Sequence, residues 1–169
     1  LDAYRRRDWA AAVQAFAAVE EETPYYRDVR FMRRTAALAA DLHSRDRSLR
    51  LQAAIELGDV ADLLDMTPLL RALGDSSKEV ADAAEASFAR IGPPAFDALI
   101  EGLTADRISI RERSYRLLQG MGQSVRDQLL NALHSPDPRI TAPVARLLVG
   151  LGARQTLARA LLTTGPEHH

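Results

Sequence analysis

Branched apolar residues recur at a nearly constant interval through the middle of the chain, at Leu49, Val80, Ile110 and Ile140, with spacings of 31, 30 and 30 residues. Small or apolar residues follow each of them after 4, 8 and 11 positions, and these offsets fall on one face of an α-helix. The residues at offset 4 are Ala53, Ala84, Ser114 and Val144, those at offset 8 are Leu57, Phe88, Leu118 and Leu148, and those at offset 11 are Val60, Ile91, Met121 and Leu151. The pattern predicts a helix with one buried face in each of four copies.

A turn and a second apolar helix follow the first helix of each copy. Offset 12 is glycine in three copies, which suits the left-handed residue that ends many helices; these are Gly92, Gly122 and Gly152. Leucine-rich segments with a shared spacing predict the second helices of the first three copies, at 69–73, 99–103 and 129–133. The loops that follow are rich in the residues of turns and helix N-caps. A period of about 30 residues built from helix pairs predicts an all-α fold of stacked repeats.

The first copy reads Leu49-Arg50-x-x-Ala53-Ala54-x-x-Leu57-Gly58-x-Val60-Ala61. This segment resembles the motif V-R-x-x-A-A-x-x-L-G-x-I-G of HEAT repeats, especially the short HEAT-like repeats of the phycobilisome-lyase type. Later copies depart from it, with Ala81 and Thr141 in place of the arginine and Ser114-Tyr115 in place of the alanine pair. The resemblance implies a right-handed α-solenoid over residues 46–163, with about four helix pairs at 46–75, 76–106, 107–137 and 138–163. It implies an architecture rather than an activity, because one fold hosts many functions.

The first fifty residues are helical in pattern but out of register with these copies. Trp9, Ala12, Phe16 and Val19 share one helical face, and Pro24 ends the unit. This stretch resembles the second helix of a tetratricopeptide repeat, except that the family's glycine is Arg7 here. We therefore expect a tetratricopeptide-like segment over residues 1–45. It includes a further helix whose face carries Val29, Met32, Ala36 and Ala39.

The N-terminal resemblance, the use of arginine and the C-terminal tail bear on the origin of the chain. The tetratricopeptide resemblance places Leu1 inside the first helix of that repeat, so we expect the chain to be a piece of a longer protein. Arginine supplies almost all of the positive charge, with Lys78 the only lysine, which is typical of high-GC bacterial coding. The tail at 164–169 has no periodicity and ends in two histidines. We expect it to be disordered and interpret its histidines as a purification-tag remnant.

Composition excludes several classes of function. The formal net charge of −1 argues against a general nucleic-acid binder. The charge is nevertheless uneven, at +2 for residues 1–50, −8 for 51–106 and +5 for 107–169. The chain has no cysteine, which rules out disulfides, thiolate metal sites and a cysteine nucleophile. No apolar run approaches the length of a membrane span. We expect a cytoplasmic protein without membrane insertion.

Residues with catalytic or metal-binding chemistry are few. His134, Ser135 and Asp137 are neighbours in one turn, whereas the members of a catalytic triad converge in space with a defined geometry. Acidic residues recur every three positions but lack the ligand pattern of a calcium loop, and they suit a solvated helix start; these are Asp59, Asp62 and Asp65. We predict no catalytic residue, no metal site and no cofactor, and therefore a protein that is not an enzyme.

Stacked helix pairs expose extended surfaces that commonly bind other proteins. In HEAT-like families the motif-bearing helix lines the concave side, where offsets 3 and 6 face solvent. In the last two copies these offsets carry Arg113, Arg116 and Arg146. We predict that the three arginines form a basic patch for an acidic peptide or a phosphorylated surface, because the planar guanidinium suits both groups. The alternative is a solvated face, or intramolecular pairs such as Arg116 with Glu112.

Two functions from different classes remain. The first is a non-catalytic protein–protein interaction scaffold or adaptor, and the alternative is nucleic-acid binding through the basic concave patch. Nucleic-acid binding needs several phosphate contacts and a steep salt dependence, and the acidic middle of the chain argues against a long groove. Tetrapyrrole attachment, as in phycobilisome lyases, rests on the resemblance alone.

Arg50 and Arg111, both at offset 1, have a different predicted role. HEAT repeats often use an arginine at this position in a ladder of aspartate–arginine pairs between loops. Asp46 and Asp106 are placed to serve as the acidic partners. We therefore predict that both arginines are structural.

The offset-8 column predicts the effect of removing a core side chain. Replacing Leu118 by Ala should cost about 2–5 kcal/mol of stability, because it deletes buried methyl groups and leaves a cavity. Thermal unfolding of the purified variant beside wild type measures the loss. An unchanged melting temperature would show that offset 8 lies outside the core.

Overall fold

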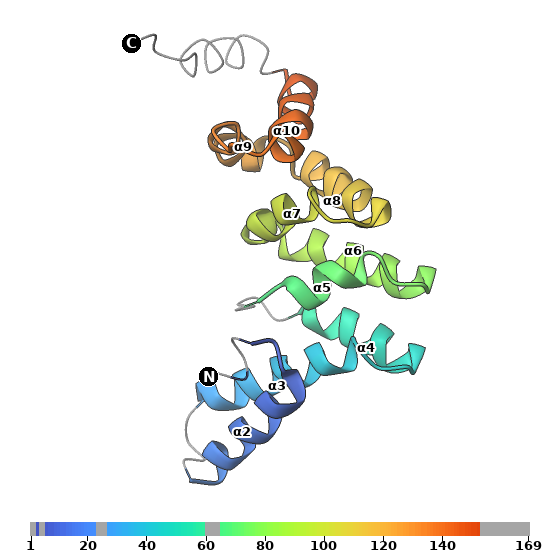
Figure 1. Cartoon of the computed structure of the whole chain (residues 1–169), viewed down its shortest axis with the longest axis vertical. Helices are drawn as coiled ribbons and strands as arrows, with labels where there is room; N and C mark the ends of the chain where they lie inside the picture. Colours follow the sequence, from blue (N-terminus) through green and yellow to red (C-terminus); the bar gives the residue numbers. More distant parts are fainter. Residues whose placement is uncertain (1–2, 4–5, 23–26, 60–64, 153–169) are drawn as a thin grey trace. The chain divides into compact units, whose positions relative to one another are not determined.

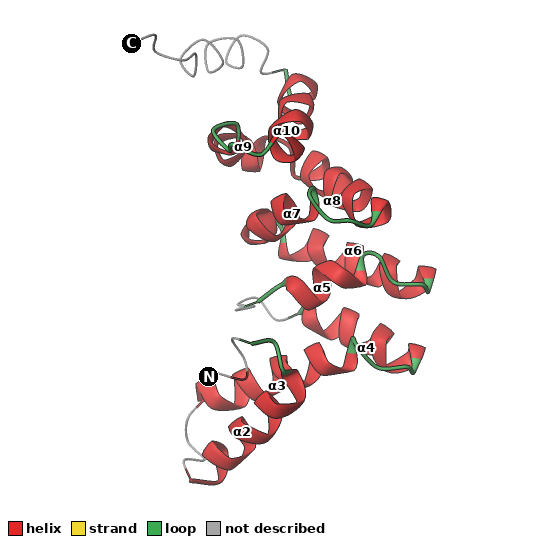
Figure 2. Cartoon of the chain, in the orientation of Figure 1, coloured by secondary structure: helices red, strands yellow, loops and turns green. Residues whose placement is uncertain are grey.

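Helices form all of the regular secondary structure in the part of the chain that the computed structural model describes, namely Ala3 and residues 6–22, 27–59 and 65–152 (Figures 1 and 2). The predicted all-α fold is confirmed for these residues. None of their helices combines the length and the hydropathy that spanning a membrane requires. In chain order the elements are α2 (Trp9–Glu22), α3 (Arg27–Asp41), α4 (Arg47–Leu57), α5 (Thr67–Ala72), α6 (Lys78–Ile91), the 3-10 helix η1 (Pro93–Ala95), α7 (Phe96–Gly102), α8 (Ile108–Met121), the 3-10 helix η2 (Gly122–Val125), α9 (Arg126–Ala132) and α10 (Pro138–Gly150).

The chain divides into two units, Leu1–Arg90 and Ile91–His169. The first holds α2 to α6 except for the last residue of α6, and the second holds η1 to α10. The predicted boundary at residues 45–46 and the stacking of the pairs into a right-handed solenoid stay predictions. The end of the predicted fourth copy, 153–163, and the tail at 164–169 lie outside the described residues.

Helices α2 and α3 form a hairpin around a small core in the first unit. Trp9, Ala12 and Phe16 of α2 and Ala36 and Ala39 of α3 are buried together. The large aromatic rings fill the space that the small side chains of α3 leave between the two backbones. The buried face predicted for this part of α2 is therefore confirmed.

Two predicted apolar positions of the first unit are exposed instead. Val19, the last predicted member of the α2 face, is 44% exposed, and Leu49, which opens the first copy, is 46% exposed. The corresponding residues of the next two copies, Val80 and Ile110, are buried. Periodicity assigns a residue to a helix face, but it does not show whether a neighbouring helix reaches far enough to cover that residue.

Arg7 has the left-handed backbone conformation, with φ at 59°, at the position where the tetratricopeptide family has glycine. For a residue with a side chain this conformation costs about 1–2 kcal/mol. The Arg7 guanidinium donates from Nε to Asp65 Oδ2 at 3.1 Å and from Nη2 to Thr67 Oγ1 at 2.9 Å. These bonds connect the start of the N-terminal hairpin to the start of α5.

The repeat columns occupy equivalent places in the structure. The residues at offsets 4 and 8 are at most 3% exposed; they are Ala53, Ala84, Ser114, Val144, Leu57, Phe88, Leu118 and Leu148. The first leucines of the second helices, Leu69, Leu99 and Leu129, are at most 1% exposed. The offset-12 glycines have positive φ angles of 69°, 57° and 78°, a region that glycine adopts readily because it has no side chain. At Gly92 and Gly122 the ψ angles are −142° and −130°, so these two residues do not have the left-handed helical conformation. The predicted burial is confirmed at offsets 4 and 8. At offset 11, Ile91, Met121 and Leu151 are half-buried and Val60 lies outside the described residues.

Helix starts repeat the same capping chemistry. Asp46 and Asp137 occupy equivalent positions, three residues before the opener of their copies. Each has an extended backbone and accepts a 2.8 Å hydrogen bond from a backbone N–H two residues later, so each caps its helix. Five residues before the opener, Ser44 and Ser135 accept bonds from the N–H groups of those aspartates. The turn and N-cap chemistry predicted for the loop at 135–138 is confirmed, whereas Arg107, the N-cap residue of α8, provides no side-chain cap.

Close helix contact in the first unit depends on small residues. Ser87 of α6 is fully buried and donates its hydroxyl to the carbonyl of Ala54 in α4 at 2.7 Å. Beside this contact, a Cβ at Gly58 would lie 2.3 Å from Ser87 Oγ, so no larger residue fits there without a shift. In the second unit, the Ser114 hydroxyl is also fully buried, but it has no hydrogen-bond partner among the described residues.

These two serines should respond in opposite directions to removal of the hydroxyl. Ser87→Ala should cost about 1 kcal/mol because it deletes a buried hydrogen bond, whereas Ser114→Ala should leave stability unchanged or raise it, because it removes an unpaired polar atom. Urea unfolding of both variants measures the difference. Equal destabilisation of the two proteins would contradict the hydrogen-bond assignment.

Candidate partner-binding groove

A hollow of about 980 Å³ lies in the second unit, on the side formed by α8 and α10 and by the loop between α7 and α8. Its lining residues are Leu103, Thr104, Ala105, Asp106, Arg111, Glu112, Tyr115, Arg116, Arg139, Pro143 and Arg146. We call this hollow the α8–α10 groove. Helices α8 and α10 contact each other, so the groove walls come from neighbouring helices of the third and fourth copies.

The groove combines positive charge with apolar surface. Four arginines line it against two carboxylates, those of Asp106 and Glu112, so its walls carry net positive charge. Tyr115 and Pro143 are half-buried between the charged groups. Guanidinium groups beside an aromatic ring and a proline provide both charge pairing and apolar contact for a bound chain.

Two of the three predicted binding arginines line the groove. Arg116 and Arg146 are exposed and belong to its walls. Arg113 is half-buried and is not among the lining residues. The structure thus brings Arg116 and Arg146 together in one concave surface, and the binding of a partner there stays a prediction.

The groove also contains two arginines that the sequence analysis did not assign to binding. Arg111 was predicted to be structural, and Arg139 lies one residue before the opener of its copy, outside the columns considered for the concave face. Arg139 Nη2 donates to Asp137 Oδ2 at 2.7 Å. This hydrogen bond, together with the bond from the Arg139 backbone N–H, lowers the pKa of Asp137. A charge that starts a helix and faces a groove could have been found by examining the helix starts as well as the helix faces.

Arg111 and Arg50 bind their own loops in the same way. Arg111 Nη1 donates to the carbonyl oxygens of Ala105 and Asp106 at 2.6 and 2.9 Å. Arg50 Nη1 donates to the carbonyl oxygens of Ser44 and Arg45 at 3.0 and 3.2 Å. In both copies the acceptors lie six and five residues before the arginine. These contacts support the predicted structural role of the offset-1 arginine.

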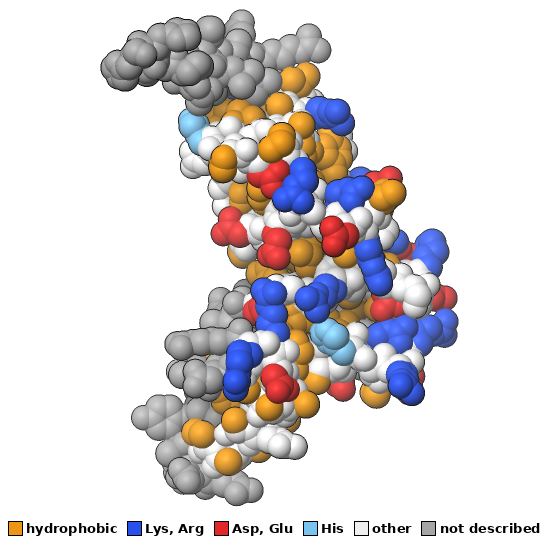
Figure 3. All heavy atoms as spheres, viewed as in Figure 1, with side chains coloured by type: hydrophobic (Ala, Val, Ile, Leu, Met, Phe, Trp, Pro, Cys, Tyr) orange, Lys and Arg blue, Asp and Glu red, His pale blue; other side chains and the backbone are white. Residues whose placement is uncertain are grey.

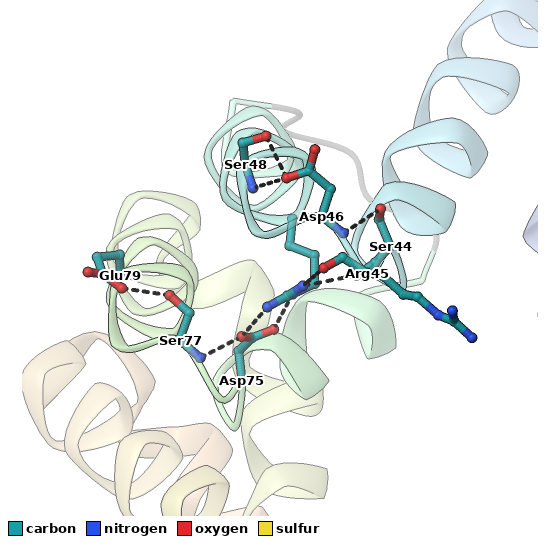
Figure 4. A network of polar contacts seen from close by, with 8 residues as sticks. Ser44, Arg45, Asp46, Ser48, Asp75, Ser77 and Glu79 are labelled. Carbon is teal, nitrogen blue, oxygen red and sulfur yellow. Dashed lines mark hydrogen bonds and ion pairs between the residues drawn. The ribbon is translucent and has the colours of Figure 1, made fainter.

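The acidic partner predicted for Arg50 is wrong. The Asp46 carboxylate caps α4 through Ser48 (Figure 4). Arg50 pairs instead with Asp75, in the loop before α6, through Nε and Nη2 at 2.8 and 3.1 Å. The Arg50 and Asp75 side chains are only 14% and 12% exposed. For Arg111, the contact with Asp106 is through its backbone carbonyl. Arg50 therefore pairs with the aspartate of the next loop, while the aspartate that precedes it caps α4.

The environment of Asp75 lowers its pKa. Burial alone would raise the pKa, but the hydrogen bond from Arg50, the bond from the Ser77 N–H and the positive charge of Arg50 together outweigh burial. The pKa of Arg50 is raised by the same hydrogen bond. The pair is thus fully charged at neutral pH, and it connects the loops before α4 and α6.

The other residues considered for catalysis or metal binding form hydrogen bonds or ion pairs with protein groups. His134 Nδ1 lies 3.2 Å from the carbonyl of Asn131, and the Ser135 hydroxyl accepts from the Asp137 N–H. Asp59 pairs with Arg90 at 2.6 Å, and Asp65 binds Arg7 and Thr67, while Asp62 lies outside the described residues. Within the described part of the chain, no three His, Asp or Glu side chains are grouped to hold a metal ion.

Charge of both signs covers the face drawn in Figure 3, where Lys and Arg side chains are interspersed with Asp and Glu side chains.

No family model matches the chain, and no curated protein matches it either. The resemblance to HEAT and tetratricopeptide repeats therefore rests on the residues quoted above.

The Arg50–Asp75 pair predicts a pH-dependent stability. Asp75→Asn should cost about 1–3 kcal/mol at pH 7, because it leaves a half-buried guanidinium without its charged partner. The folded-state pKa of Asp75 lies below its unfolded value, so this contribution is present above the ordinary aspartate pKa of about 3.9 and is lost as the pH falls through the folded value.

Urea unfolding at several pH values from neutral to acidic measures this dependence. Wild type and the Asp75→Asn protein should converge in stability in acid. Glu101→Gln, which removes an exposed carboxylate in α7, is the control. A stability gap between wild type and Asp75→Asn that is the same at every pH would contradict an ionised pair.

Proposed function

We propose that this chain is a non-catalytic protein-interaction scaffold, in which HEAT-like helix pairs in an α-solenoid follow a tetratricopeptide-like segment and the α8–α10 groove binds an acidic protein or peptide. The observation that carries the proposal is the lining of this groove. Exposed Arg116 and Arg146 face the same hollow as Arg139, with Tyr115 and Pro143 beside them. Such a surface suits an extended segment that carries carboxylates.

The repeated local structure supports the architectural part of the proposal. Equivalent residues of successive copies are buried in the same way, and Asp46 and Asp137 cap the first helices of copies one and four alike. Such recurrence is expected when each pair is one unit of a stack. An array of this kind leaves long surfaces available for partners.

Nucleic-acid binding is the second candidate function, and the positive groove is the observation in its favour. One observation weighs against it. On the face drawn in Figure 3, acidic and basic side chains are mixed, whereas a nucleic-acid footprint is a continuous basic stripe.

A pull-down with charge-reversed variants tests the proposed function. The bait is wild type beside an Arg116→Glu/Arg146→Glu protein, in a lysate of the source organism. We expect a protein partner that wild type retains and the variant releases, because two attractions to its carboxylates become repulsions. Partners are identified by mass spectrometry.

The matched control is Arg45→Glu/Arg71→Glu, which reverses two exposed arginines of the first unit outside the groove. Circular dichroism verifies that all three baits are folded. Retention of the same proteins by all three baits would contradict binding in the groove. Loss of the bound material after nuclease treatment, or at moderate salt together with nucleic acid, would favour the second candidate.

A further inference from the structure

Arg50 and Arg111 occupy one repeat position but differ in what their remaining donors bind. Both guanidinium groups use Nη1 for two carbonyls of the preceding loop. Arg50 uses Nε and Nη2 for the two carboxylate oxygens of Asp75. Within the described residues, the hydrogen bonds of Arg111 are the two from Nη1. Its other N–H groups have no acceptor there.

The repeat register explains this difference. Asp75 lies five residues before Val80, the opener of the second copy, and Ser135 lies five residues before Ile140, the opener of the fourth. Both side chains accept a hydrogen bond from the N–H two residues later, so the two loops have the same local geometry. By register, the fourth copy therefore has a hydroxyl at the position where the second copy has the carboxylate that pairs with Arg50.

Arg111 faces the α8–α10 groove, so its unused donors are accessible to a partner. It is half-buried in the groove wall, with Arg139 and Arg146 among the other lining residues. Partial burial strengthens a charge-assisted hydrogen bond relative to one in bulk water. Asp106 and Glu112 reduce the positive charge of the groove but do not cancel it.

We propose that the α8–α10 groove contains an aspartate-binding subsite at Arg111, in which Nε and Nη2 hold the carboxylate of an aspartate from an exposed loop of a partner protein. The subsite rests on the proposed scaffold function and specifies the chemistry of the partner. The intramolecular pair of Arg50 with Asp75 is its structural template. The partner's aspartate takes the place at Arg111 that Asp75 takes at Arg50.

Ser135→Asp tests the subsite directly, because it supplies the carboxylate that the second copy already has. The new side chain can still accept from the Asp137 N–H, as Asp75 accepts from the Ser77 N–H. The control is Ser135→Asn, which retains this acceptor without the charge. We expect Ser135→Asp to raise the melting temperature by about 2–4 °C and the control to leave it unchanged.

Binding is measured by NMR titration of the Arg111 Nε–Hε resonance in the full chain. The probe is an acetylated and amidated peptide with the sequence of residues 73–77, Leu-Gly-Asp-Ser-Ser, beside the same peptide with asparagine. We expect a saturable shift with the aspartate peptide alone. The Ser135→Asp protein should show the shifted resonance without peptide and bind the peptide at least about tenfold more weakly, since one charged partner displaces the other.

Several outcomes would overturn the subsite. One is an unchanged Arg111 resonance and peptide affinity in Ser135→Asp, and another is equal binding of the asparagine peptide. A third is a shift of the resonance by inorganic phosphate or a short oligonucleotide at a lower concentration than the peptide requires. That result would show that the site binds a phosphate rather than a carboxylate. If Asp137 repels the new carboxylate and Ser135→Asp loses stability, Arg111→Lys decides, because lysine keeps the charge without the planar fork. An unchanged peptide affinity in Arg111→Lys would also overturn the subsite.

The subsite and the proposed function can fail separately. A pull-down partner that Ser135→Asp retains in full would leave the scaffold standing and exclude the subsite from its binding. A positive titration without any protein partner in the pull-down would leave the subsite standing and remove the support for the scaffold.

Discussion

The approach of one helix backbone to the next is the contact on which the repeat architecture depends. In the first unit, the Ser87 hydroxyl reaches the carbonyl of Ala54, and Gly58 leaves room for both Ser87 and Arg90. Small residues in the middle of each buried face allow this spacing, and large ones on either side fill the remaining volume. A helix six or seven residues long, such as α5 or α7, buries little surface by itself. Its stability must therefore come mainly from this packing.

Much of the fold could be predicted from the sequence, because burial in a repeat follows a simple period. The columns that contain Ala53, Leu57 and Gly92 predicted buried positions and glycines with positive φ that the structure contains. The exposure of Leu49 and the pairing of Arg50 could not be predicted in this way. Each depends on how far a neighbouring helix or loop extends, and a period along one helix carries no information about that distance.

The candidate groove was predictable only in part for a related reason. Offsets identified Arg116 and Arg146 because both point away from the buried face of their helices. Arg139 and the loop at 103–106 come from helix ends, where the helical period no longer describes direction. The chain also uses arginine for two purposes, holding loop carbonyls in place and lining the groove, and Arg111 does both. Residue type and position alone do not separate these roles.

The bonds of Arg7 have a consequence for the order in which the chain can mature on the ribosome. Asp65 and Thr67, which hold its guanidinium, follow it by 58 and 60 residues. At a synthesis rate of about 5–20 residues per second, their translation trails that of Arg7 by several seconds. Until then the guanidinium of Arg7 has neither of these acceptors. Final locking of the N-terminal segment therefore awaits the emergence of α5.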